Sequence, residues 1–169
     1  MKVMRRVGAG LFALLLSLVV ASPALAASPW HGHKHHNNIY TTDSGATSMF
    51  FTPSGVNSLN VVTKFDYVAP KYAVPNPEWL RLCYMPFGAS TAQACTGWRD
   101  YESQPELRAF SVLPSDFKLV DADGNYTGGA FTNTMYAKGT FSLQHNFPGG
   151  LDSMVFNDPG YDDLYVYYR

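Results

Sequence analysis

The chain contains only two cysteines, Cys83 and Cys95, among its 169 residues. Their separation excludes the Cys-x-x-Cys pattern that is typical of redox sites and of many structural zinc sites. In a protein exported to an oxidising compartment, two cysteines with a single possible pairing favour one structural disulfide. The alternative is a thiol pair that binds a metal or carries out redox chemistry.

Long apolar runs are also scarce, and the clearest one spans residues 11–20. It is too short to cross a bilayer as a helix, which needs about 20 apolar residues. Basic residues precede this run and small residues follow it, as in a secretory signal peptide. We therefore expect residues 1–26 to be removed, the mature chain to begin at Ala27, and the protein to be exported without stable membrane insertion.

Charged residues are few, at 15% of the chain, and the formal net charge is −1. Three of the 12 Lys and Arg residues lie in the predicted signal peptide, so 9 remain against 13 acidic residues. A mildly acidic mature chain lacks the basic surface that nucleic acids require. Nucleic acid is therefore not an expected partner.

Familiar catalytic patterns are absent from the sequence. There is no Gly-x-Ser-x-Gly, no His-Glu-x-x-His and no phosphate-binding glycine loop. His145 shares its predicted face with apolar residues, which favours a hydrogen-bonded histidine in or beside the core. A catalytic role would need a partner, and the sequence nominates none. We expect no catalytic residue, no cofactor and no enzymatic activity.

Two acidic segments resemble cation sites without completing one. Residues 121–125 read DADGN, like the start of an EF-hand loop, but the sixth position is Tyr126 rather than Gly. A hairpin turn at Asp123 and Gly124 is the better interpretation. Three aspartates also lie near the last strand candidate, where we expect them to be solvated: Asp158, Asp162 and Asp163.

Residues 27–48 are polar and lack apolar periodicity, which predicts a flexible N-terminal arm. This arm contains a histidine tract, formed by His31, His33, His35 and His36. Neutral imidazoles bind divalent transition metals, so a metal-binding protein that uses this tract is one alternative function. The spacing matches no defined site, however, which favours an adventitious chelator and a chain with no metal site.

From Met49 onward, apolar and polar residues alternate with the period of a β-strand. The best-defined strand candidates are residues 58–68, 79–85, 107–113, 135–147 and 161–169, separated by Pro- and Gly-rich turns. In the first of them, the residues expected to face the core are Leu59, Val61, Thr63, Phe65 and Tyr67. We predict a single all-β domain over residues 49–169, an antiparallel β-sandwich or partly open barrel of about seven to eight strands.

Aromatic residues make up 15% of the chain. In the last strand candidate Leu164, Val166 and Tyr168 are expected to face the core, while Tyr165 and Tyr167 face outward. These two tyrosines, with Trp98 beside the predicted disulfide, are candidate partner-binding residues. They would stack on sugar rings or anchor a protein partner, although core or cross-strand packing is the simpler explanation for such aromatic residues.

Three segments in a fixed order resemble the periplasmic flagellar protein FlhE family. They are LRLC at 80–83 followed by Cys95, FSLQHNFPGG at 141–150, and LYVYYR at 164–169. The resemblance covers about Leu59 to Arg169. It transfers to this chain only the disulfide between Cys83 and Cys95 and a turn at Pro148, Gly149 and Gly150.

The resemblance implies a β-sandwich protein that is exported to the periplasm, has no catalytic activity and supports flagellar assembly. The implied partner is a protein of the flagellar export apparatus or rod, and the implied role is chaperone-like or gate-sealing, limiting proton leakage. The histidine tract, the longer stretch between the cysteines and the segment from Leu113 to Met135 depart from the family pattern. A carbohydrate-binding module acting on an envelope glycan is the alternative from a different functional class.

Overall fold

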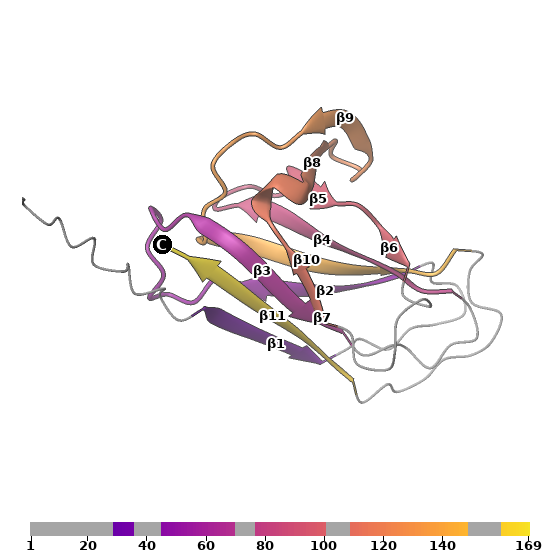
Figure 1. Cartoon of the computed structure of the whole chain (residues 1–169), viewed down its shortest axis with the longest axis horizontal. Helices are drawn as coiled ribbons and strands as arrows, with labels where there is room; N and C mark the ends of the chain where they lie inside the picture. The colour runs from indigo at the N-terminus through magenta and orange to yellow at the C-terminus, as the bar shows by residue number, and fades with distance from the viewer. Residues whose placement is uncertain (1–28, 36–44, 70–76, 101–108, 149–159) are drawn as a thin grey trace, which may run out of the picture.

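The structure, a computed structural model, describes residues 29–35, 45–69, 77–100, 109–148 and 160–169. All of its paired strands are antiparallel and form two sheets (Figure 1). The four-stranded sheet has the order β1 (Trp30–His35), β11 (Tyr161–Tyr168), β3 (Val62–Val68) and β7 (Ala109–Val112). The seven-stranded sheet has the order β2 (Gly45–Phe51), β10 (Gly139–Asn146), β4 (Trp79–Pro86), β5 (Ala94–Thr96), β8 (Phe117–Val120) and β9 (Tyr126–Ala130), with β6 (Arg99–Asp100) also pairing with β4.

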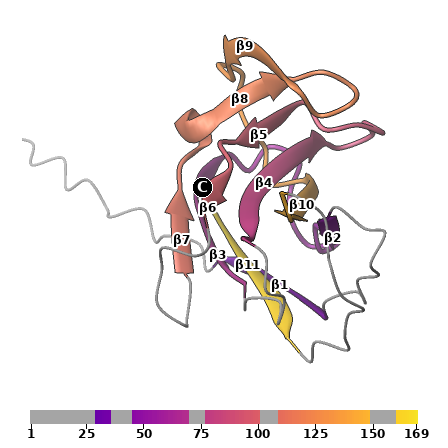
Figure 2. The same ribbon diagram turned by 90° about the vertical axis from the view of Figure 1, so that its right-hand side faces the viewer.

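The predicted all-β antiparallel sandwich is confirmed. Figure 2 shows the four-stranded sheet and the seven-stranded sheet as two layers, with β9 and β8 at the top of the view. The only helix in the described ranges is a single 3₁₀ turn, η1 (Pro114–Asp116). The described residues alone contain eleven strands rather than seven or eight, because the predicted arm contributes β1 and because β5 and β6 are very short.

The core lies between the sheets and is rich in aromatic rings. Phe141 of β10 occupies its centre, with ring centroids 5.2 Å from Phe65, 5.4 Å from Tyr84 and 5.8 Å from Trp30. These distances lie within the range of favourable aromatic pairs. The period-two pattern of residues 135–147 correctly predicts which apolar side chains face the core. All five of them are buried: Met135, Ala137, Phe141, Leu143 and Phe147.

The last strand candidate is confirmed as β11, which lies inside the four-stranded sheet between β1 and β3. Leu164 and Val166 are fully buried, and Tyr168 packs against the core. The predicted face of β3 is only partly right, because Leu59 and Thr63 are exposed. The register with β11 shifts at this point, so that Tyr168 pairs with Val62 and skips Thr63. This bulge turns Val62 into the core in place of its neighbour.

The flexible arm predicted over residues 27–48 needs correction wherever the structure describes it. Residues Trp30–His35 form β1, which pairs with β11 along its whole length, and β2 begins at Gly45. Trp30 anchors β1 because its side chain is buried in the core. Gly32 permits the close approach, since a Cβ there would lie 2.5 Å from the Phe50 ring. The predicted signal peptide and the remainder of the arm lie outside the described residues.

Two local predictions concern the seven-stranded sheet. Cys83 and Cys95 are directly opposite each other on β4 and β5 and form the predicted disulfide. The turn at Asp123 and Gly124 joins β8 to β9, and Gly124 has a φ of +81°, which glycine adopts without strain. Of the predicted turn at residues 148–150, only Pro148 lies within the described residues. In the described part of the chain, no helix has the length and apolar character needed to span a membrane.

Candidate functional site

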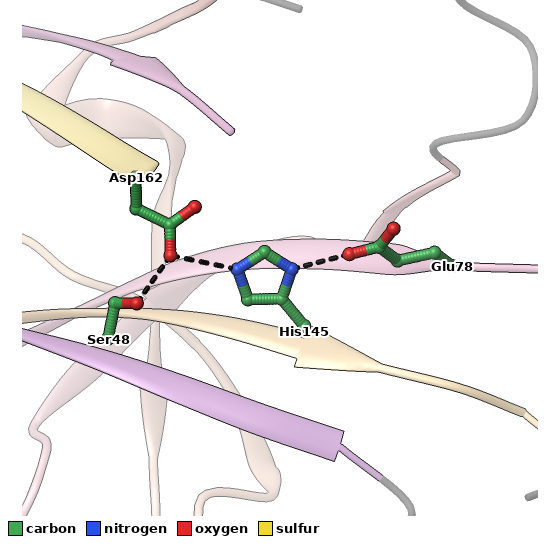
Figure 3. Close-up of polar contacts among 4 residues, drawn as sticks. All are labelled: Ser48, Glu78, His145 and Asp162. Atoms are coloured by element: carbon green, nitrogen blue, oxygen red, sulfur yellow. Dashed lines mark hydrogen bonds and ion pairs between the residues drawn. The ribbon is translucent and has the colours of Figure 1, made fainter. Parts of the chain in front are cut away.

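A chain of four polar side chains crosses the core from one sheet to the other (Figure 3). His145 of β10 lies at its centre, with Nδ1 2.5 Å from Oε1 of Glu78 and Nε2 3.1 Å from Oδ2 of Asp162. The Ser48 hydroxyl of β2 donates to the same Asp162 oxygen. Asp162 belongs to β11, so the network joins the four-stranded sheet to the seven-stranded sheet.

This network is deeply buried, since the side chains of His145, Glu78 and Asp162 have no exposed surface. Burial by itself lowers the pKa of His145 because it disfavours the charged imidazolium. The hydrogen bonds and charges of Asp162 and Glu78 outweigh burial and raise the pKa to about 9 from its ordinary value of 6.5. The imidazole is therefore protonated at neutral pH and lies between two acidic side chains.

The raised pKa of His145 makes the stability of the protein depend on pH. A group with a raised folded-state pKa stabilises the protein fully below its unfolded value, here 6.5, and loses this contribution as pH rises through about 9. We expect the free energy of unfolding to fall by about 2 to 3 kcal/mol between pH 6.5 and 9. Urea unfolding followed by tryptophan fluorescence at several pH values measures this change.

The His145→Gln variant is the control for this pH dependence, because it removes the titrating group. Its stability is expected to be lower at every pH but to change much less between pH 6.5 and 9. An imidazole nuclear magnetic resonance titration of His145 centred near pH 6.5 in the parent protein would contradict the expectation.

The arrangement of this network differs from that of a nucleophilic triad. In such a triad the hydroxyl donates to the imidazole and a carboxylate orients the other ring nitrogen. Here the Ser48 hydroxyl donates to Asp162, and both nitrogens of His145 face carboxyl groups. The geometry supports a structural connection between the sheets. Asp162 was expected to be solvated, and this is wrong, because β11 pairing turns its side chain into the core.

An accessible polar site lies on the outer face of the seven-stranded sheet. Two adjoining hollows of about 250 and 630 Å³ share Thr47, Arg81, Asp123 and Gln144, and we call them together the Arg81 groove. Cross-strand pairing of Gln144 with Thr47 and Arg81 builds its floor. The turn of the β8–β9 hairpin and the ring of Trp98 contribute to its walls.

Arg81 lies in the floor of the groove, where it is only 8% exposed and its side chain is held by several contacts. Its Nε donates to Gln144 Oε1 at 2.7 Å and its Nη1 donates to the carbonyl of Gly124 at 2.8 Å. The guanidinium carbon lies 4.3 Å from the centre of the Trp98 ring, in cation–π contact. These contacts use only part of the five donors of the guanidinium.

No carboxylate forms an ion pair with Arg81 among the described residues. A largely buried positive charge without a carboxylate is costly unless hydrogen bonds compensate it. The guanidinium therefore presents charge and remaining N–H donors to whatever enters the groove. It is suited to a carboxylate, which a guanidinium binds with two parallel hydrogen bonds, or to carbonyl oxygens, each of which accepts a hydrogen bond from an N–H group.

The three predicted partner-binding residues lie on opposite sides of the sandwich. Trp98 belongs to the Arg81 groove, whereas Tyr165 and Tyr167 lie on the outer face of the four-stranded sheet. Each ring has one covered face: Arg81 lies over Trp98, His31 stacks on Tyr165 at 4.4 Å, and Lys64 lies over Tyr167 at 4.3 Å. The three residues therefore form no common surface.

Comparison with known proteins adds no family assignment. No family model matches the chain, and no curated protein matches it. Among solved structures, a chain described as Desmodium yellow mottle tymovirus is similar at 9% sequence identity, with 99% of this chain and 94% of that chain covered. Its TM-score of 0.36 is too low to support an argument about fold or function.

Proposed function

We propose that this chain is an exported, non-enzymatic β-sandwich protein that supports bacterial flagellar assembly by binding a protein of the flagellar export apparatus or rod. The proposed role is chaperone-like or gate-sealing and limits proton leakage. The observation that carries the binding mode is Arg81, a guanidinium without a carboxylate partner among the described residues, which faces an open polar groove beside Trp98.

The resemblance to the FlhE family supports the flagellar part of this proposal. Its three segments coincide with β4 and its disulfide, with β10, and with β11. Two of these strands, β4 and β10, pair over eight residues each and carry the floor of the Arg81 groove. Two of the three segments that resemble the family therefore contribute to the candidate binding face, and the third, β11, lies in the other sheet.

The chemistry of the Arg81 groove supports a protein partner. Its polar floor and its arginine match a peptide segment that offers a carboxylate or backbone carbonyls, and arginine and tryptophan are the residues that most often dominate protein interfaces. The disulfide beside the groove fits an oxidising compartment such as the periplasm. The covered ring faces of Trp98, Tyr165 and Tyr167 give the glycan-binding alternative no added support.

Deletion of the gene tests the flagellar role. We expect reduced swimming, filaments in the periplasm or increased proton permeability, all restored by the parent gene. Complementation with Arg81→Gln or Trp98→Ala is expected to fail, and either substitution is expected to weaken binding to a tagged rod or export-gate component by about 30-fold or more.

Tyr167→Ala is the matched control, because it removes an aromatic residue from the opposite side of the sandwich. It is expected to restore swimming fully and to bind normally. Rescue by Trp98→Ala but not by Tyr167→Ala would move the binding face to the four-stranded sheet. Unchanged motility, envelope and proton permeability in the deletion strain would refute the flagellar role, and retention by peptidoglycan that depends on Trp98 would favour a glycan.

A further inference from the structure

Two histidines and an aspartate converge on the outer face of the four-stranded sheet. In the register of β1 with β11, His33 is directly opposite Asp163 and His31 is directly opposite Tyr165. Residues that alternate along a strand share one face of the sheet, so His31 and His33 both point outward. Asp163, on the central strand β11, lies between them.

The donor atoms of this cluster, which we call the His31–His33–Asp163 cluster, are close enough to share one ion. His31 Nε2 lies 2.6 Å and His33 Nδ1 lies 2.7 Å from the same oxygen, Oδ1 of Asp163. The ligand atoms of all three residues lie within 4.8 Å of one another. Metal–ligand bonds of about 2.0 to 2.2 Å separate neighbouring ligands by roughly 3 Å, so small side-chain rotations would suffice.

Aromatic stacking holds both imidazoles in place without an ion. The His31 ring is stacked on Tyr165, with centroids 4.4 Å apart and planes 4° from parallel. The His33 ring is stacked on Tyr161, with centroids 4.3 Å apart and planes 11° from parallel. Each histidine therefore has a fixed orientation, and less side-chain entropy is lost when it binds a ligand.

We propose that the His31–His33–Asp163 cluster binds a divalent transition metal ion such as Zn²⁺ or Cu²⁺. Two imidazole nitrogens and one carboxylate oxygen form a donor set that suits these ions better than Ca²⁺ or Mg²⁺, which prefer oxygen ligands. The side chains of His31 and His33 are 42% and 53% exposed and that of Asp163 is 24% exposed, so an ion reaches them from solvent. Water would complete the coordination.

The ligand set differs from chelation by a flexible histidine tract. His35 lies on the same face, but its ring meets Tyr161 edge-on at 4.9 Å and is not part of the cluster. Asp163 lies 130 positions from His33 in the sequence and is brought close only by the β1–β11 pairing. Metal binding that depends on Asp163 would therefore require the folded sheet.

A bound ion would join the edge strand β1 to the central strand β11. A ligand that binds only the folded state raises its stability in proportion to the logarithm of ligand concentration over the dissociation constant. We therefore expect Zn²⁺ to raise the melting temperature of the protein. This effect is separate from the Arg81 groove, which lies on the other sheet.

Calorimetric titration of ZnCl₂ into metal-stripped protein, purified without a histidine tag, tests the proposal. We expect one ion per chain. Asp163→Asn and His33→Ala are each expected to weaken binding by at least about tenfold and to abolish the rise in melting temperature. The matched controls are His35→Ala and Asp66→Asn, which change a neighbouring histidine and a neighbouring aspartate on the same sheet face and are expected to bind like the parent.

Three results would overturn the proposal. The first is the absence of saturable binding up to about 1 mM Zn²⁺, which would mean that any dissociation constant lies above that concentration. The second is parental affinity in Asp163→Asn, which would assign binding to the histidine tract alone. The third is an equal loss in His35→Ala, which would show a different ligand set. Melting temperatures in EDTA establish that each variant is folded.

Discussion

Replacement of Asp162 with alanine is expected to lower the free energy of unfolding by about 3 to 5 kcal/mol, as is typical when one partner of a buried ion pair is removed. Asp162 accepts hydrogen bonds from the Ser48 hydroxyl and from Nε2 of His145, and all three side chains are buried. The substitution leaves both donors in the core without this acceptor. Chemical denaturation at pH 7 measures the loss.

Asp163→Ala provides a matched control for this experiment, because it changes the adjacent residue on the opposite face of β11. Its hydrogen bonds with His31 and His33 are solvent-exposed, so in metal-free buffer it is expected to change stability by less than about 1 kcal/mol. A loss of similar size in both variants would mean that the buried network contributes no more than the surface contacts do.

Replacement of Phe141 with alanine is expected to have an effect of similar size, about 3 to 5 kcal/mol. The Phe141 ring contacts Trp30 of β1, Phe65 of β3 and Tyr84 of β4, and so bridges the two sheets. Its removal leaves a cavity enclosed by large rings that cannot easily move into the space. Thermal and urea unfolding of the purified variant measure the change.

Phe51→Ala is the appropriate comparison, because Phe51 lies near Phe141 on the neighbouring strand but is 67% exposed. Its substitution is expected to change stability by no more than about 0.5 kcal/mol. If Phe141→Ala were equally mild, the rings around position 141 would have to repack into the cavity. A crystal structure of the variant would reveal such repacking.

The strands with a strong period-two pattern were the part of the fold that sequence could predict. β10 and β11 alternate large apolar residues with polar ones, and the apolar residues expected to face the core do pack in it, although Asp162 and Ser142 are buried as well. β1 was missed because Trp30, Gly32 and Lys34 alternate on one side of it and only Trp30 is a buried apolar residue, so there is no apolar stripe. Its strand conformation follows from pairing with β11, and that partner is far away in the sequence.

The candidate sites were harder to predict because they depend on contacts between distant segments. Glu78 is next to a Pro-rich connection and Asp162 lies among other acidic residues, so each reads as a solvated carboxylate. Arg81 sits in an alternating strand, where an outward arginine is usually just a charged surface residue. One signal of the buried network was present in the sequence, namely His145, a titratable residue on an apolar face. A buried histidine needs hydrogen-bonding partners, but the sequence did not identify Glu78 and Asp162 as those partners.

The pairing of β1 with β11 also determines the order in which the two sheets can be completed when the chain becomes available from its N-terminus onward. Within the described residues, every strand of the seven-stranded sheet ends by Asn146, whereas the four-stranded sheet needs residues that follow Gly160. A nascent chain that stops before Tyr161 would hold β1 and β3 without the strand that separates them, and the inner face of the larger sheet would lack its cover. We expect such an intermediate to be prone to aggregation and to need protection until β11 is available for pairing.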